Sequence, residues 1–386
     1  MTIQNVAVIR DRGRMTALIA VWDALARHPN ADRQVYDLTI ESHGKTSTPV
    51  LLATSDEHGA INALIIGRQE PTVVEFRIGY TCLFRFTTTA LNIVYGGVLG
   101  TVAASDASAI LRAVDQAIRK TGVSLVKFSP LPVESALYKA VNQDINAFRR
   151  QWKVDPYRHF VLDLPKDFNK FLERLSAKHR SSIRRYRKKL DNAFPEPVTI
   201  VLDKGEESIR ALCGTIERVA ATTYQRGMGR GFFHNTSWER RLTIEAERGA
   251  LRVFIMYSGS TPLAFWIFVT QSNVAHSVAT GYQPSVSAFT PGTLLLIDAV
   301  ETFIEEALDT IDWGLGYADY KQRFSNREWL EAEIAYGAPS VRGVGINLIR
   351  SSSVLIDTAL KGIFKRFGLI PVIKKRLRQR LRRVSG

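Results

Sequence analysis

Cysteine is nearly absent from this sequence of 386 residues, which contains only Cys82 and Cys213. The two lie far apart and no histidine cluster accompanies them, so the sequence predicts neither a disulfide framework nor a zinc site. A secretory signal is lacking too, because Arg10, Arg12 and Arg14 interrupt the region where an apolar stretch would be needed. We therefore expect a cytoplasmic protein that needs no metal.

Several common catalytic motifs are also missing. The sequence has no GxSxG, HExxH, Walker loop or complete GxGxxG fingerprint, so serine hydrolases, zinc proteases, P-loop NTPases and dehydrogenases lose their usual support. Acyl transfer without a covalent intermediate stays open, since it needs only a bound thioester, an amine and a base. Residues 253–297 contain no Asp, Glu, Lys or Arg, but turns such as YSGSTP divide them into strand-length pieces and argue against a membrane span.

Positive charge is concentrated near the end of the chain. The net charge is +15, yet residues 341–386 hold twelve Lys or Arg and a single acid, Asp357. The preceding 340 residues carry only +4, which requires no nucleic acid partner. With 45% hydrophobic and 23% charged residues the composition is that of a globular protein.

The order of the expected elements predicts an α+β fold in two domains, because the chain exceeds the usual limit of about 250 to 300 residues for one core. In the first half we expect a helix near 15–27, strands at 35–42, 48–57, 59–69 and 91–100, a helix at 105–122, a strand at 123–132 and a helix at 134–147. In the second half we expect a helical block at 168–192, a strand at 197–203, helices at 206–226 and 238–248, strands at 251–259, 262–271 and 273–282, a helix at 291–308 and a strand at 310–316. The expected domains are 1–155 and 156–345, followed by a basic tail at 346–386.

A loop rich in Ser, Thr, Pro and Gly precedes the helix expected to begin near Thr293. The first N–H groups of a helix have no intrahelical partner and its dipole favours negative charge, so this start can bind a phosphate or pyrophosphate. A plain strand-to-helix connection is the alternative.

A second candidate is the basic segment from Arg174 to Lys189, which holds eight Lys or Arg. On a helix its apolar residues gather on one side and leave the charge on the other. The basic face is either simply solvated or binds an anion such as a coenzyme phosphate, a nucleotide-linked sugar or RNA.

The C-terminal tail has an apolar stripe at Ile356, Leu360, Ile363 and Phe367, and a similar stripe follows Pro371. This predicts two amphipathic helices broken at the proline. Through residues 352–384 they would lie on an anionic membrane surface or pack on the body of the protein, with RNA contact as a third alternative.

Three of these segments, in order, resemble the GNAT acyltransferase superfamily, in the branch of the Fem-like and CelD-type (BioF-like) transferases. RLSAKHRSSIRRYRKKL resembles the basic helix of that branch, and FTPGTLLLIDAVETFIEEAL resembles its Pro-Gly-x-x-Leu helix start. IDWGLGYADYKQRF is similar to its Asp-x-Gly-x-Gly-x-x-x-Tyr-Lys-x-x-Phe ending. Together they span about residues 168–324.

The resemblance implies two tandem GNAT-like domains, each a mixed, mainly antiparallel sheet flanked by helices. It also implies acetyl-CoA or another acyl-CoA as co-substrate, no metal, and an amine acceptor such as an amino sugar or a cell-envelope or polysaccharide precursor. The residues implied for the pyrophosphate loop and helix start are Phe289, Thr290, Gly292, Thr293 and Leu294.

For catalysis the resemblance implies direct transfer in a ternary complex. Asp319 would act as the base, Tyr320 as the acid toward the departing thiolate, and Lys321 as a partner for an acidic acceptor. Arg184, Tyr186 and Arg323 are the candidate substrate-binding residues. A structural polar cluster is the alternative for the first three.

Pro291 departs from the loop pattern of the superfamily and removes one N–H donor. Aminoacyl-tRNA therefore stays open as the donor, although no long coiled-coil insertion of the kind many Fem enzymes carry is present. A degenerate GNAT-fold protein that binds a membrane or RNA is the alternative to an enzyme.

Overall fold

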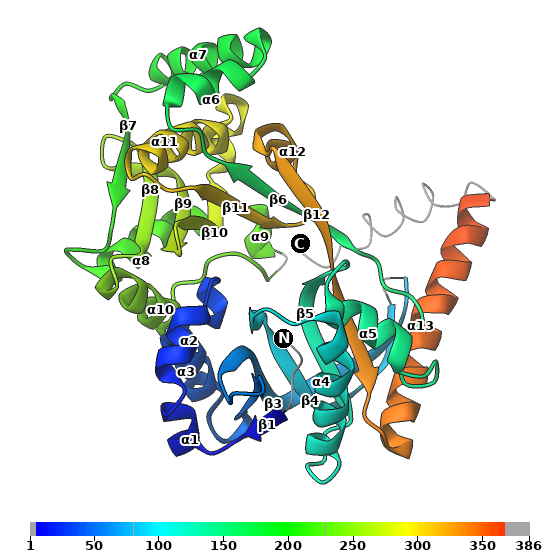
Figure 1. The fold of residues 1–386 in the computed structure, drawn as a ribbon. Helices are drawn as coiled ribbons and strands as arrows, with labels where there is room; N and C mark the ends of the chain where they lie inside the picture. The colour runs from blue at the N-terminus through cyan, green and yellow to red at the C-terminus, as the bar shows by residue number, and fades with distance from the viewer. Residues whose placement is uncertain (1–4, 80, 228, 367–386) are drawn as a thin grey trace. The chain divides into compact units, whose positions relative to one another are not determined.

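The computed structural model describes residues 5–79, 81–227 and 229–366 (Figure 1). Its contacts divide the chain into two compact units. Within the described residues, unit 1 contains 5–18, 45–156 and 332–366, and unit 2 contains 19–44 and 157–331. The units differ from the expected domains because 19–44 pack in unit 2 and 332–345 in unit 1.

Unit 1 is a sheet in the order β1-β2-β3-β4-β5, with the second half of β12 beyond β5. The first four strands are antiparallel, whereas β4 and β5 are parallel and are connected through a helix, α4. The elements are β1 (Asn5–Ile9), α1 (Arg12–Thr16), β2 (Thr48–Ser55), β3 (Ile61–Ile78), β4 (Thr81–Gly100), α4 (Ala104–Ile118), β5 (Leu125–Pro132), α5 (Ala136–Asp144), β12 (Arg327–Gly337) and α13 (Val341–Arg366).

Unit 2 repeats this plan in the order β6-β11-β10-β9-β8-β7, where only β10 and β11 are parallel and α11 connects them. Residues 327–331 of β12 pair with β6. The elements are α2 (Ile19–Leu25), η1 (Pro29–Ala31), α3 (Arg33–His43), β6 (Tyr157–Asp163), α6 (Phe168–Arg174), α7 (Ala177–Asp191), β7 (Val198–Asp203), α8 (Ile209–Ala220), α9 (Tyr224–Gly227), α10 (Thr236–Glu247), β8 (Leu251–Ser258), β9 (Thr261–Gln271), β10 (Val274–Tyr282), η3 (Pro284–Phe289), α11 (Pro291–Glu305), β11 (Thr310–Leu315) and α12 (Asp319–Phe324).

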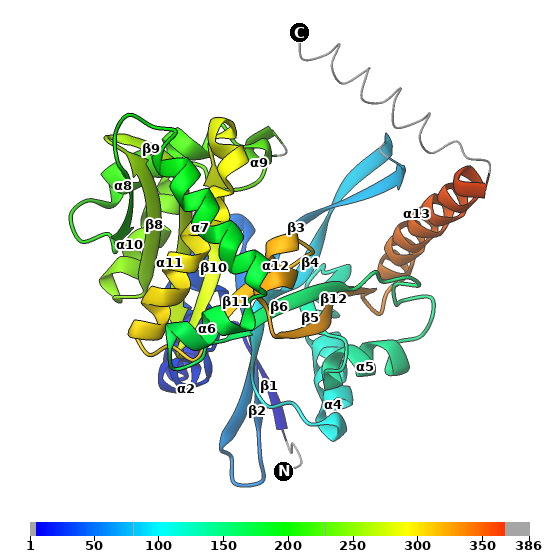
Figure 2. The same cartoon turned by 90° about the horizontal axis from the view of Figure 1, so that it is seen from above.

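Helices cover both faces of the unit 2 sheet. One buried cluster joins the sheet to α6, α7 and α11, and a second joins the opposite face to α8 and α10. The apolar α11 is buried along most of its length because it packs against β8, β9 and β10. In Figure 2, α7 lies beside α11, and the two helices are in contact. The expected α+β class is confirmed.

The strand expected at 35–42 is wrong, since these residues lie in α3. Tyr36, Leu38 and Ile40 have the period of two that is typical of a strand. The segment nevertheless forms a helix, because the Asp32 carboxylate caps its start by accepting hydrogen bonds from the N–H groups of Gln34 and Val35.

Other boundaries also moved. The helix expected at 15–27 is divided between α1 and α2, and the block at 168–192 is divided where Ser176 caps α7. The helix expected at 206–226 is divided between α8 and α9. The α12 helix and β12 were not anticipated.

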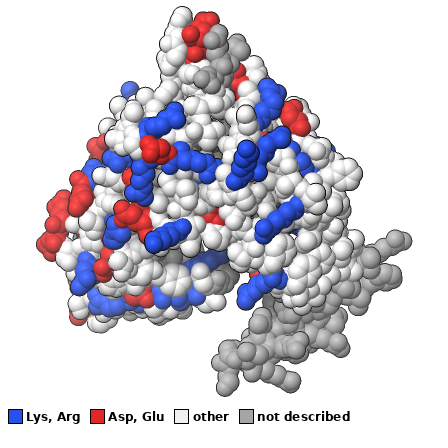
Figure 3. All heavy atoms as spheres, turned by 90° about the horizontal axis from the view of Figure 1, so that it is seen from below, with Lys and Arg blue, Asp and Glu red and all other residues white. Residues whose placement is uncertain are grey.

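The tail begins as one continuous helix, α13, which starts at Val341 rather than at 346. The second predicted amphipathic helix, after Pro371, lies outside the described residues. Within the described part of the chain, no helix is both long and apolar enough to cross a membrane. On the face drawn in Figure 3, Lys and Arg side chains are scattered rather than gathered in a single patch.

Candidate active site

Strands β10 and β11 separate partway along their length. They pair only from Val274 to His276 and from Thr310 to Asp312, although β10 continues to Tyr282 and β11 to Leu315. Both strands change register at the point of separation, β10 after Ser277 and β11 after Asp312. Because such bulges bend a strand, the two parallel strands open into a V with His276 and Asp312 at its apex.

A cavity of about 740 Å³ lies next to the diverging end of β10. Its size falls within the range of about 300 to 1,000 Å³ that is usual for small-molecule sites. It brings together six residues that the sequence proposed for donor and acceptor binding: Thr290, Gly292 and Thr293 at the start of α11, and Asp319, Tyr320 and Arg323 on α12. Trp266, Thr223, Gln225 and the end of β10 complete much of its lining.

The start of α11 is built around Thr290, which has a left-handed backbone with φ 50° and ψ 52°. Its Oγ1 is buried and has no hydrogen-bond partner among the described residues. Pro291 has no N–H, and the N–H groups of Thr293 and Leu294 donate to the Thr290 carbonyl, which leaves Gly292 as the remaining first-turn donor. A Cβ at Gly292 would meet nothing within 4 Å. Strain and an unsatisfied hydroxyl beside open space are features of ligand sites.

Thr290→Asn is expected to stabilise the fold, because a β-branched residue in the left-handed region costs about 1 to 2 kcal/mol and asparagine tolerates it better. Thermal unfolding should show a midpoint that is higher by a few degrees. Ser287→Asn, on the exposed neighbouring turn, should leave the midpoint unchanged. A lower midpoint for Thr290→Asn would contradict the assignment of strain.

Three consecutive residues of α12 occupy different environments, because successive helical residues point about 100° apart. Asp319 is exposed at the first position of the helix. The ring of Tyr320 packs edge-on against Trp266 and Trp313, at 5.3 and 6.3 Å between centroids. Lys321 Nζ donates to the carbonyls of Gly314 and Leu315, at 3.2 and 2.7 Å.

Lys321 is buried and does not line the cavity. Burial lowers its pKa to about 8, although Asp312 partly opposes the shift. The ammonium therefore ties α12 to the end of β11, next to the opening of the V.

The other proposed residues lie away from the cavity. Leu294 is buried in the core, and Phe289 packs against Phe194 and lies under Lys189 Nζ, 5.5 Å from the ring centroid. Arg184 is exposed on α7, whereas Tyr186 is half-buried beneath a neighbouring arginine. The basic helix α7 contacts α11 and η3 without contributing to the cavity lining.

Sequence reasoning missed a buried ionic cluster at the apex of the V. His159 Nε2 lies 2.7 Å from Asp312 Oδ1, and its Nδ1 lies 3.2 Å from Glu331 Oε1. Trp329 stacks on the imidazole ring at 4.3 Å and also donates its indole N–H to Glu331. Burial by itself would lower the pKa of His159, but the hydrogen bonds to both carboxylates raise it to about 9. Burial likewise opposes ionisation of Asp312, yet the histidines hold its pKa well below the usual range.

Two further histidines adjoin this cluster. His276 Nδ1 lies 3.3 Å from Asp312 Oδ2, and the His28 ring meets His276 edge-on at 4.9 Å. One ligand atom each from His28, His276 and Asp312 lie within 4.8 Å of one another, as in a metal site. The donor chemistry fits a cation poorly, because His28 Nδ1 accepts the Asn30 N–H at 3.1 Å and its other ring nitrogen then carries the proton.

The fold and the cavity define a class. Two parallel strands joined by a helix diverge, and the start of that helix faces a ligand-sized cavity. Residues 177–322 match the family model described as an acetyltransferase (GNAT) domain. The chain therefore carries a GNAT acyltransferase domain.

Solved structures share the fold. FemX is 10% identical with a TM-score of 0.53, over 86% of this chain and 97% of FemX. A conserved Bacteroides thetaiotaomicron protein of unknown function is 11% identical with a TM-score of 0.51, over 86% of this chain and all of that one. The C-terminal domain of an Agrobacterium fabrum protein named as a lysylphosphatidylglycerol synthetase is 10% identical with a TM-score of 0.50, over 89% and 96% of the two chains.

At such identities the likeness concerns the fold alone. No curated protein matches the sequence. The resemblance to the GNAT superfamily is confirmed by the domain match over residues 177–322.

Proposed function

We propose that unit 2 transfers an acyl group from acyl-CoA to an amine acceptor within a ternary complex. The observation that carries this proposal is the cavity next to the diverging end of β10, because it adjoins both the start of α11 and the polar residues of α12. The start of α11 is suited to an anionic donor, and α12 on the other side of the cavity offers side chains that can accept or donate protons.

The donor would rest its pyrophosphate on the start of α11. The Gly292 N–H, the positive end of the helix dipole and the open space above this glycine favour an anion there. Bound acyl-CoA supplies a thioester, and a β10 N–H near the Ser277 bulge would donate to its carbonyl oxygen as negative charge develops.

The acceptor amine would attack the thioester carbon from the α12 side. Its nitrogen forms the new bond to carbon while the carbon–sulfur bond breaks. The carboxylate of Asp319, which is exposed at the cavity, would take the amine proton through a water molecule. The Tyr320 hydroxyl would return a proton to the departing thiolate, and Lys321 would hold α12 in position through its two carbonyl contacts.

Turnover of labelled acetyl-CoA with a panel of amines, including amino sugars, tests this proposal. Tyr320→Phe keeps the packing on Trp266 and Trp313 but removes the hydroxyl, so kcat should fall by about 10²-fold or more while acetyl-CoA affinity stays unchanged. Asp319→Asn should lower kcat similarly. Unchanged turnover in both variants would show that neither residue is catalytic, and no turnover by wild-type protein with any amine would favour a binding protein over an enzyme.

Aminoacyl-tRNA is a second candidate donor, and one feature favours it. Pro291 has no N–H, and the N–H of Thr293 already donates to the Thr290 carbonyl. A pyrophosphate would therefore find only one free N–H in the first turn of α11. Calorimetry with acetyl-CoA distinguishes the donors, since a complete absence of binding would exclude acyl-CoA. Peripheral membrane attachment through residues 352–384 also stays a proposal, because only 352–366 are described.

A further inference from the structure

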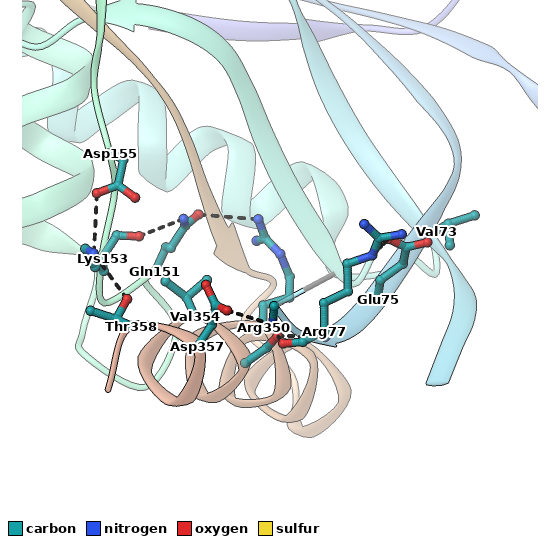
Figure 4. Close-up of a pocket in the computed structure, with 12 residues that line it drawn as sticks. Val73, Glu75, Arg77, Gln151, Lys153, Asp155, Arg350, Val354, Asp357 and Thr358 are labelled. Carbon is teal, nitrogen blue, oxygen red and sulfur yellow. Dashed lines mark hydrogen bonds and ion pairs between the residues drawn. The ribbon is translucent and has the colours of Figure 1, made fainter. Parts of the chain in front are cut away.

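Unit 1 contains a groove of about 750 Å³ that is separate from the acyltransferase cavity of unit 2 (Figure 4). Three segments of the chain form the groove, and each segment lines it with the residues of one side. The lining comprises Val73, Glu75 and Arg77 of β3, Gln151, Lys153 and Asp155 of the segment before β6, and Arg350, Ser353, Val354, Asp357 and Thr358 of α13, together with Gly79.

The three acids of the groove already have partners. Glu75 pairs with Arg77 at 2.7 Å, and Asp155 lies 3.6 Å from Lys153. Asp357 accepts the N–H of Gly79 at 2.7 Å. Glu75 and Asp155 are each paired with another cation, and none of the three acids forms an ion pair with the remaining cation of the groove.

That cation is Arg350. Its Nη2 donates to Gln151 Oε1 at 3.3 Å, while its Nη1 is shielded from solvent with no acceptor among the described residues. Among the described residues no carboxylate forms an ion pair with Arg350, and the carboxylate whose charge acts on it, Glu333, pairs with Lys127 at 3.5 Å. Burial lowers the pKa of the guanidinium, and Glu333 opposes the shift from a distance.

Arg350 is half-buried, and a guanidinium with a shielded nitrogen and no ion-pair partner is unusual, since charges withdrawn from solvent are paired as a rule. Within the folded chain an ion pair would need a carboxylate in contact with the guanidinium, and none of the described carboxylates is in contact with it. In Figure 4 Arg350 extends from α13 toward Gln151, beside the space between the three segments. A ligand in that space would supply the missing charge.

We propose that this groove binds a small organic molecule through a single oxyanion, a carboxylate or a phosphodiester, held by Arg350. The guanidinium is a planar fork of donors that matches both groups. One uncompensated positive charge favours a monoanion, because the partnered acids Glu75, Asp155 and Asp357 around it disfavour a second negative charge. The groove is larger than an inorganic ion needs and of the size that metabolite-like ligands occupy.

Binding is measured on the full-length protein with dimethyl phosphate, by the line width of its ³¹P signal, and with acetate by competition. Wild-type protein should broaden the signal, and acetate should reverse the broadening. Arg350→Gln should abolish it, whereas Arg342→Gln, which removes the same charge from an exposed position of α13, should not. Equal broadening by both variants would overturn the proposal, as would no broadening by wild-type protein.

Phosphodiester can come from a free molecule or from a lipid headgroup, and sedimentation with phosphatidylglycerol vesicles separates these sources. Loss of vesicle binding in Arg350→Gln but not in Arg342→Gln indicates the lipid headgroup. Vesicle binding that is equal in wild type and both variants, with dimethyl phosphate binding still dependent on Arg350, indicates a free ligand.

Thermal unfolding provides a second test of the proposal, which does not depend on ligand binding by the variant. Without an added anion, Arg350→Gln should unfold at the same or a higher temperature than wild type, because it removes a half-buried charge that has no ion-pair partner in the described part of the chain. A marked decrease would show that the protein itself satisfies Arg350, which would overturn the proposal. Acyl transfer to a small amine should be unaffected in this variant, so failure here and failure of the unit 2 proposal are distinguishable.

Discussion

Gly292→Asp is expected to abolish acyl-CoA binding while leaving the fold intact. The new side chain meets open space, and an acid in the first turn of α11 suits the helix dipole, so stability should be unchanged or slightly higher. The same carboxylate would occupy the position proposed for the donor pyrophosphate. We expect the acetyl-CoA dissociation constant, measured by calorimetry, to rise by about 100-fold or more through charge repulsion and lost space.

Gly292→Asn is the matched control, since it has the size of aspartate without its charge. Its affinity for acetyl-CoA should fall less than that of Gly292→Asp, and the difference between the variants should shrink at high salt. If both variants bind acetyl-CoA as wild type does, the pyrophosphate does not lie at this helix start.

His159→Gln is expected to destabilise unit 2 strongly. His159 is the cation between two buried carboxylates, Asp312 and Glu331, and removal of one member of a buried ion pair costs about 3 to 5 kcal/mol. Denaturant unfolding at pH 7 should show this loss in the free energy of unfolding. The exposed His58 provides the control, and His58→Gln should change the free energy by no more than about 0.5 kcal/mol.

The same cluster predicts how stability depends on pH. The pKa of His159 is raised in the folded state to about 9, above its unfolded value of about 6.5. Its contribution is therefore fully present below about pH 6.5 and is lost as the pH rises through about 9. Between pH 6.5 and 9 the free energy of unfolding of wild-type protein should fall more steeply than that of His159→Gln. Equal pH dependence of the two proteins would contradict a charged His159.

The class of fold and several residues of the candidate site were predicted from local sequence. The helix start at Pro291 to Thr293 and the YADYKQRF segment each combine turn residues with polar groups over a short stretch, so their chemistry is visible without the fold. The structure places Thr290, Gly292, Asp319 and Tyr320 around one cavity. The roles of these residues stay predictions until the variants above are measured.

Secondary structure was readable where the apolar pattern was unambiguous, as in α4 and β8. It was misread where the pattern and a capping residue conflict. Residues 35–42 alternate like a strand, yet the cap at Asp32 and burial of Tyr36 against Trp22 make them a helix. Local periodicity loses to capping and packing when a segment is short.

What the sequence determined by itself is the set of local features: the class of fold, the polar helix starts and the location of the basic residues. Only the tertiary structure decided which distant residues meet. The cluster is made of residues from five separate segments, none of which shows a recognisable motif around its residue: His28, His159, His276, Asp312 and Glu331. Arg350 likewise gives no signal in the sequence. The chemistry of a charged side chain depends on whether it has a partner of opposite charge. Which charges lie next to each other is decided only when segments distant in the sequence pack together.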